Sequence, residues 1–260
     1  MPKSVIRWLV AVVTLFAGLS GAAAGAAEIK VVSAIAMRAA LQELAPAFEK
    51  ASGHKLKIEY ATAGKVEEKV AADEEIDVAI LNKPRADKLV GKAKLVGGTA
   101  ATVARVPIGV GVKKGAVKPD ISSVDAFKKT LVSAKSIAYT DPASGGAHGI
   151  HMAQLVDKLG LAAELKPKTK LATPTPGKGV DDLVAHGDAE LGILPVSEFM
   201  DKAGVDVVGP LPAELQSPEF AFVAASPMVS EQPLPAKALI DFLGAPEAKA
   251  VYKAKGMEPS

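Results

Sequence analysis

Short apolar runs alternate along this 260-residue chain with longer segments whose apolar residues recur every three or four positions. A continuous apolar run is typical of a strand buried on both faces, and the longer spacing is typical of an amphipathic helix. The first series predicts strands over residues 29–32, 55–60 and 76–81, and helices over residues 37–52, 65–72 and from Pro84 onward. Such a β-α-β-α-β order indicates a mostly parallel sheet with helices on both faces.

A second series follows a long extended stretch over residues 99–112. It predicts strands over residues 136–139, 170–172, 190–194 and 205–208, and helices that end near residues 131, 159 and 185. The tail adds an extended apolar run over residues 220–225 and helices over residues 235–243 and 246–255. The expected fold class is α/β, with two lobes built on mixed, mostly parallel sheets. We assign residues 28–105 plus 222–260 to lobe 1 and residues 106–221 to lobe 2.

Two extended segments, near residues 103–111 and 218–223, would cross between these lobes side by side. Paired crossings of this kind form a hinge, and a hinge between two lobes creates a cleft that can close on a ligand.

The first 27 residues have the order of an export signal, so we expect a periplasmic protein. Lys3 and Arg7 precede an uncharged apolar run over residues 8–19, and small residues follow up to Ala27. The run is short for a membrane-spanning helix, which needs about 20 apolar residues, although an uncleaved anchor is the alternative. We expect cleavage after Ala26 or Ala27. The chain has no Cys, which excludes a lipid-modified cysteine and disulfide bonds.

Composition narrows the class of ligand. Without Lys3 and Arg7 the 31 basic residues become 29 and equal the 29 acidic residues, which argues against a nucleic-acid partner. Aromatic residues make up only 4% of the chain, which weighs against ligands that stack on aromatic rings, such as sugars or bases. Polar groups and backbone are therefore expected to hold the ligand.

Four small or Gly-rich loops stand where a predicted strand ends: residues 33–36, 61–64, 141–148 and 194–197. Ligands of open α/β sheets bind at such strand ends, and the N–H groups that start a helix attract anions. Each loop alone could be an ordinary helix cap. Together they make a binding cleft the better interpretation, with these candidate ligand-binding residues: Ser33, Ala34, Thr62, Ala63, Ser144, Gly145, Gly146, His148 and Pro195.

The loop over residues 141–148 and the helix after it also contain the residue types of two other chemistries. His148 and His151 have the spacing of a metal pair, but no third ligand stands near them in sequence, so we expect neither a metal nor a cofactor. Asp141, Ser144 and His148 are the residue types of a hydrolase triad. They crowd one loop, however, and the G-x-S-x-G motif is absent. A serine hydrolase therefore stays an alternative to a binding protein that acts by closing and performs no chemistry.

The stretches EIKVVSAIAMRAALQELAPAFEKASGHKLKIEYATAG, IDVAIL, YTDPASGGAHGIHMAQLVDKLGL and ELGILPVSE resemble the extracytoplasmic solute-binding proteins of ABC importers. The resemblance is to the branch that includes the periplasmic molybdate-binding protein and covers nearly all of the mature chain. It implies the type II periplasmic binding fold, two lobes closing on a small anion, a membrane permease as partner and a monomeric protein. A protein presenting its ligand to a membrane receptor is an alternative.

The same resemblance implies that the ligand differs from molybdate. The family holds its oxyanion with two serine hydroxyls and a tyrosine, and these positions correspond here to Ala36, Ala63 and Pro195. Each hydrogen bond to a charged group contributes about 1.5 to 3 kcal/mol, so losing them weakens binding. We expect a small organic carboxylate, or an oxyanion held differently, that meets His148, Lys65 or Arg38. A molybdate or tungstate binder of the same fold is the alternative.

Overall fold

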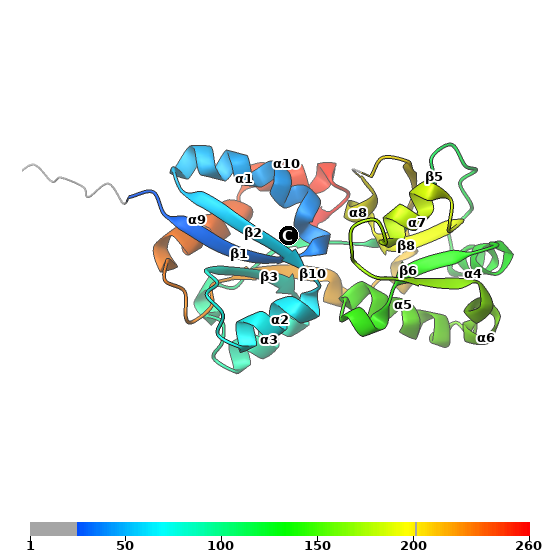
Figure 1. Cartoon of the computed structure of the whole chain (residues 1–260), viewed down its shortest axis with the longest axis horizontal. Helices are drawn as coiled ribbons and strands as arrows, with labels where there is room; N and C mark the ends of the chain where they lie inside the picture. Colours follow the sequence, from blue (N-terminus) through cyan, green and yellow to red (C-terminus); the bar gives the residue numbers. More distant parts are fainter. Residues whose placement is uncertain (1–24, 201) are drawn as a thin grey trace, which may run out of the picture.

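The computed structural model describes residues 25–200 and 202–260, and its strands form two separate sheets (Figure 1). The first sheet has the order β11-β4-β10-β3-β1-β2. Its strands are β1 (Glu28–Ala34), β2 (Lys55–Ala61), β3 (Val78–Asn82), β4 (Ala101–Arg105), β10 (Ala221–Ala225) and β11 (Glu258–Pro259). Its helices are α1 (Arg38–Ser52), α2 (Ala63–Ala71), α3 (Lys83–Gly91), α9 (Pro233–Leu243) and α10 (Pro246–Ala254), with the 3-10 turns η1 (Ile35–Met37) and η2 (Gly97–Thr99).

The second sheet has the order β7-β6-β8-β5-β9. Its strands are β5 (Ile108–Lys113), β6 (Ile137–Thr140), β7 (Thr169–Ala172), β8 (Leu191–Pro195) and β9 (Val205–Pro210). The accompanying helices are α4 (Val124–Ser133), α5 (Ala147–Lys158), α6 (Ala162–Leu165), α7 (Val180–His186) and α8 (Val196–Met200). Short 3-10 turns complete it: η3 (Pro142–Ser144), η4 (Lys166–Lys168), η5 (Ala213–Leu215) and η6 (Pro218–Phe220).

The expected two-lobed α/β fold is confirmed, with a larger antiparallel share than expected. In each sheet the parallel pairs join strands linked by helices, as between β1 and its neighbours β2 and β3. The strands that carry the chain between lobes, β4, β5 and β10, pair antiparallel. Of these, β5 and β10 each follow a segment that crosses between the sheets, whereas β4 follows α3 and η2 of its own lobe and leads out of it. The sequence pattern also missed the short helices α6 and α8.

Local signals explain the elements that were predicted. All five residues of β3 are buried, as its apolar run over residues 78–81 indicates, and polar Asn82 is buried at its end. Helix α1 buries one stripe that includes Leu41, Leu44 and Phe48, and it ends at Gly53, whose φ of 77° suits a residue without a side chain. Ser123 caps α4 by accepting a hydrogen bond from the Ala126 N–H at 3.1 Å.

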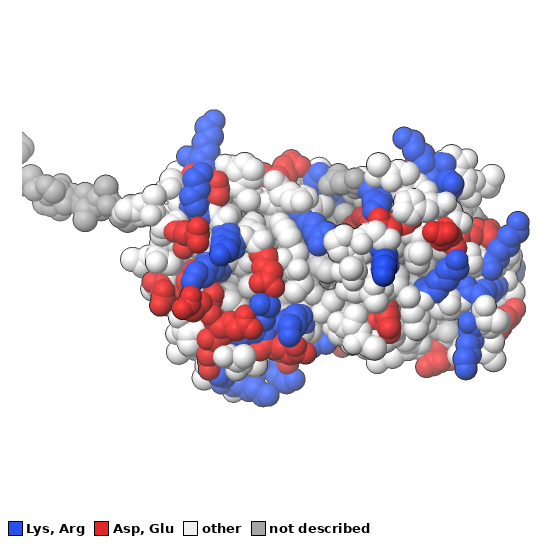
Figure 2. All heavy atoms as spheres, in the orientation of Figure 1, with Lys and Arg blue, Asp and Glu red and all other residues white. Residues whose placement is uncertain are grey.

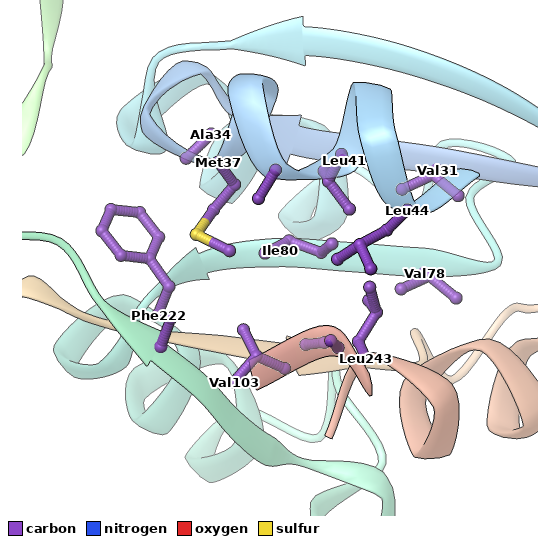
Figure 3. Close-up of a cluster of buried hydrophobic side chains, with 14 of the residues drawn as sticks. Val31, Ala34, Met37, Leu41, Leu44, Val78, Ile80, Val103, Phe222 and Leu243 are labelled. Atoms are coloured by element: carbon purple, nitrogen blue, oxygen red, sulfur yellow. The ribbon is translucent and has the colours of Figure 1, made fainter. Parts of the chain in front are cut away.

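Each sheet has its own core. In lobe 1, the side chains of Met37 in η1 and Leu41 in α1 lie against Ile80 of β3, and Phe222 of β10 closes the same cluster (Figure 3). In lobe 2, Phe127 of α4 is fully buried over the second sheet. Since both sheets bury an apolar face under helices, each lobe is stabilised mainly by its own hydrophobic core.

The chain crosses from the first sheet to the second between β4 and β5, and returns between β9 and β10 (Figure 1). The two crossings lie side by side, because the Val106 N–H donates to the Phe220 carbonyl at 2.9 Å. The Arg105 guanidinium also donates to the Ser217 carbonyl at 3.3 Å. The first predicted lobe boundary falls within its crossing, and the second falls one residue inside β10. The paired crossings have the arrangement of a hinge.

The predicted export signal falls almost entirely on residues 1–24, outside the described residues, so its cleavage stays a prediction. Within residues 25–200 and 202–260, no helix is both long and apolar enough to cross a membrane. Acidic and basic side chains are interspersed on the face shown in Figure 2, as the balanced composition predicts.

Candidate functional site

Two adjoining cavities lie between the lobes. A narrow pocket of about 40 Å³ is formed where loops from both lobes meet, and a cavity of about 400 Å³ extends from it. Four residues line both: Ile35, Thr140, Pro174 and Glu198. The larger volume falls within the range of about 300 to 1,000 Å³ that is usual for small-molecule sites.

The narrow pocket is surrounded by the starts of helices. Residues 34–36 open η1 and Thr62 with Ala63 opens α2, both from lobe 1, while residues 146–149 open α5 and Pro195 precedes α8, both from lobe 2. Neither Ala34 nor Gly146 makes a side-chain cap hydrogen bond. N–H groups that are not satisfied by a cap suit an anion, since they are orphan donors at the positive end of a helix.

The structure brings together six of the nine candidate residues. Ala34, Thr62, Ala63, Gly146, His148 and Pro195 all line the narrow pocket. Ser33 and Ser144 line neither cavity, because their hydroxyls are turned to backbone: Ser33 donates to the Ala34 carbonyl at 3.1 Å and Ser144 to the Asp141 carbonyl at 2.7 Å. Gly145 also lines neither, and its carbonyl accepts the Gly64 N–H at 3.2 Å. Contact of any of the nine residues with a ligand stays a prediction.

The three positions that the resemblance pairs with the family's hydroxyl-bearing residues are apolar in this pocket. Ala36, Ala63 and Pro195 lie in its wall, and the hydroxyls among its lining residues belong to Thr62 and Thr140. The Thr62 hydroxyl already accepts the Lys65 N–H at 3.3 Å. The pocket therefore offers backbone donors at its helix starts and few side-chain donors.

His148 stands in this pocket as a neutral ring. It packs on Phe220 with ring centroids 4.5 Å apart and on Phe222 at 6.1 Å, and among the described residues its buried Nε2 has no hydrogen-bond partner. Burial, and after it the His151 charge, lower the pKa of His148 to about 3, although a hydrogen bond with the Val106 backbone opposes the change. His148 can therefore donate or accept a hydrogen bond near pH 7, but it does not offer a positive charge to a ligand carboxylate.

Two positively charged side chains line the larger cavity, and only one of them is paired with carboxylates among the described residues. Lys202 is paired with Asp181 at 2.8 Å and also with Asp182. The Arg38 guanidinium stands 5.0 Å over the centre of the Tyr60 ring, and no carboxylate pairs with it in the part of the chain that the structure describes. Arg38 is thus the cation available to a ligand that reaches from the narrow pocket into the larger cavity.

Sequence reasoning missed Glu198, which is the one acidic residue among residues 25–200 and 202–260 that lines both cavities. It lies in the first turn of α8, half-buried, and no hydrogen bond or ion pair holds its carboxyl within the described residues. Burial, and after it the charge of Asp181, raise the pKa of Glu198 to about 8, while Arg38 acts in the opposite direction. An acid three residues after Pro195, at the carboxyl end of a buried strand, was the available signal.

The arrangement does not favour the two other chemistries. Ser144 donates to a backbone carbonyl rather than to His148, and the Asp141 carboxylate accepts the Ala143 N–H at 2.9 Å, so the three residues form no relay. His151 bonds to the Leu215 carbonyl at 2.9 Å. Over residues 25–200 and 202–260, no group of three or more His, Cys, Asp or Glu residues is placed to hold a metal ion.

Comparison with known proteins agrees with this geometry. Residues 29–258 match the family of bacterial extracellular solute-binding proteins. An aconitate isomerase from a Pseudomonas species is 31% identical over 237 residues, which is 89% of this chain and 87% of the relative. A molybdate-binding protein of Azotobacter vinelandii is 30% identical over 249 residues, covering 94% of this chain and 95% of the relative.

A solved structure of the periplasmic molybdate-binding protein of Azotobacter vinelandii superimposes with a TM-score of 0.72 at 22% identity, over 88% of this chain and 98% of that one. At this identity the likeness concerns the fold, which is the two-lobed type II arrangement. The chain thus belongs to the bacterial extracellular solute-binding proteins, within their molybdate-binding-like branch.

Proposed function

We propose that this protein captures a small organic carboxylate with more than one acidic group in the interlobe cleft and delivers it to the permease of an ABC importer. The observation that carries the proposal is the narrow pocket of helix starts opening into a cavity of about 400 Å³ that contains Arg38. One carboxylate of the ligand would accept hydrogen bonds from the backbone N–H groups of the pocket, and a second would pair with the Arg38 guanidinium.

The pocket walls favour such a ligand over molybdate. A tetrahedral oxyanion would fill only the narrow pocket, where the family's hydroxyls are replaced by Ala36, Ala63 and Pro195. The larger cavity gives a longer ligand its additional contacts. The relative named aconitate isomerase supports this ligand class, because aconitate carries three carboxylates.

Calorimetry with the purified protein tests the proposal. The panel contains trans-aconitate, citrate and the saturated tricarboxylate tricarballylate, against molybdate, tungstate and sulfate. We expect a tricarboxylate to bind at least about tenfold more tightly than any oxyanion. Tight binding of molybdate and none of the carboxylates would refute the proposed ligand class.

Arg38→Gln refines the test. A hydrogen bond to a charged group contributes about 1.5 to 3 kcal/mol, so its loss should weaken carboxylate binding by about 10- to 150-fold. Lys92→Gln removes one positive charge at an exposed position just after α3, outside both cavities, and should leave the affinity unchanged. Equal effects of both substitutions would mean that Arg38 acts only through net charge.

A second candidate function is isomerisation of the bound carboxylate. Two observations favour it: the relative that bears an enzyme name, and the unpaired acidic side chain of Glu198 at the junction of the cavities. Conversion of trans-aconitate to its cis form by the purified protein, followed by proton NMR, tests this function directly. A protein that binds the ligand without converting it would remain a capture protein.

A further inference from the structure

We propose that Glu198 moves a proton between two carbon atoms of an unsaturated carboxylate held in the cleft. The inference rests on the proposed binding of an organic carboxylate there. It adds a chemical step and names the residue that performs it.

Glu198 is placed where such a step must occur. It lies at the junction of the two cavities, with Ile35, Thr140 and Pro174 as the other shared wall residues. A ligand whose ends reach the helix starts of the narrow pocket and Arg38 of the larger cavity would pass its central carbon atoms along this wall. The Glu198 carboxyl is not held by any other described side chain or backbone group, so it is available to the ligand.

The surroundings keep both forms of this carboxyl accessible. Asp181 of α7 faces it as a like charge, although Lys202 pairs with that aspartate at 2.8 Å, and Arg38 of α1 faces it as the opposite charge. His148, which also lines the narrow pocket, is neutral. Burial outweighs these charges, and a proton-transferring group works best when its pKa is near the working pH.

The proposed step conserves atoms and electrons. The ionised Glu198 carboxylate takes a proton from the methylene carbon next to the double bond. The electron pair of the broken C–H bond becomes the new C=C bond. The electrons of the old double bond accept the proton back from Glu198 at the far alkene carbon. One C–H bond breaks and one forms, the double bond moves by one position, and Glu198 regains its starting charge. For aconitate this shift can interchange the cis and trans forms.

Arg38 would assist the same step. Negative charge spreads onto a ligand carboxylate while the proton is on Glu198, and a guanidinium within the cleft stabilises that charge where it develops. The apolar side chains of Ile35 and Pro174 beside Glu198 would limit access of water to the reacting carbons.

The test follows trans-aconitate in D₂O by proton NMR with catalytic amounts of the protein. We expect deuterium to enter the methylene and vinyl positions as the cis form appears. Glu198→Gln should lower both rates by about 100-fold or more, the usual contribution of a general acid–base. The same variant should bind tricarballylate within about threefold of the unchanged protein. Glu164→Gln, at an exposed position of α6 outside both cavities, is the matched control and should change neither quantity.

The outcomes separate the two proposals. Binding of tricarboxylates with no exchange and no conversion would overturn the role of Glu198 and leave the capture function intact. Failure to bind any carboxylate would overturn both. If Glu198→Gln does not fold, the pH profile of the unchanged protein decides: the exchange rate should rise up to about pH 8 and then level off, and a rate independent of pH between 6 and 10 would refute the proposal.

Discussion

Gly64→Ala should impair closure of the lobes without destabilising either of them. Gly64 is the second residue of α2, and its N–H donates across the cleft to the Gly145 carbonyl at 3.2 Å. A Cβ added at Gly64 would lie 2.9 Å from the Gly145 oxygen and 3.3 Å from its Cα. Both are backbone atoms of a turn whose Gly145 has a φ of 74°, so neither can rotate away.

The magnitude follows from these contacts. Relief of the clash requires the two backbones to separate by about half an ångström, which breaks the hydrogen bond at a cost of about 1 kcal/mol. Residual overpacking at the cleft adds about 1 to 2 kcal/mol. The closed state therefore loses about 2 to 3 kcal/mol, and ligand affinity should fall by about 30- to 150-fold. Ala favours a helix over Gly, so lobe 1 itself should gain up to about 1 kcal/mol.

Calorimetry gives the change in affinity, and small-angle X-ray scattering with and without ligand gives the degree of closure. Thermal unfolding verifies that the variant is as stable as the unchanged protein. Gly91→Ala at the end of α3 is the control, because a Cβ there would meet no atom within 4 Å. An affinity within threefold of the unchanged protein would refute the reasoning, since it would mean that binding does not use the contact between Gly64 and Gly145.

Two further predictions concern stability. The pKa of Glu198 is raised in the folded state to about 8 from an ordinary 4.5, so between these pH values the folded protein keeps the Glu198 proton and the unfolded chain has lost it. The free energy of unfolding should therefore fall as the pH rises from 4.5 to 8. This fall in the free energy of unfolding is at most about 1.4 kcal/mol per pH unit. Urea unfolding of Glu198→Gln should show a smaller fall than the unchanged protein. An identical pH dependence of the two proteins would contradict the raised pKa of Glu198. Tyr252→Phe removes a buried hydroxyl that donates to the Leu243 carbonyl at 2.9 Å, and should lower the unfolding free energy by about 1 to 2 kcal/mol. An unchanged thermal midpoint would show that water replaces the lost partner.

The elements that position the site could be read from the chain because their signals are local. Apolar runs predict the strands, and small residues such as Thr62 and Gly146 mark the loops at which helices begin. Parallel strands align their carboxyl ends, so these loops were expected to gather, and Ala63, His148 and Pro195 do line one pocket. The short helix α8 escaped prediction because five residues show no helical period.

The sequence by itself determined the two-lobed order of strands and helices, the balanced charge and the small or apolar residues at Ala36, Ala63 and Pro195. Only the tertiary structure decided which side chains face the cleft and in which protonation state. Ser33 turns its hydroxyl to the backbone of its own strand. His148 is neutral because two Phe rings cover it, and Glu198 holds its proton because burial and Asp181, distant in sequence, raise its pKa. Desolvation and charge–charge interactions depend on neighbours in space, and those neighbours are set by packing.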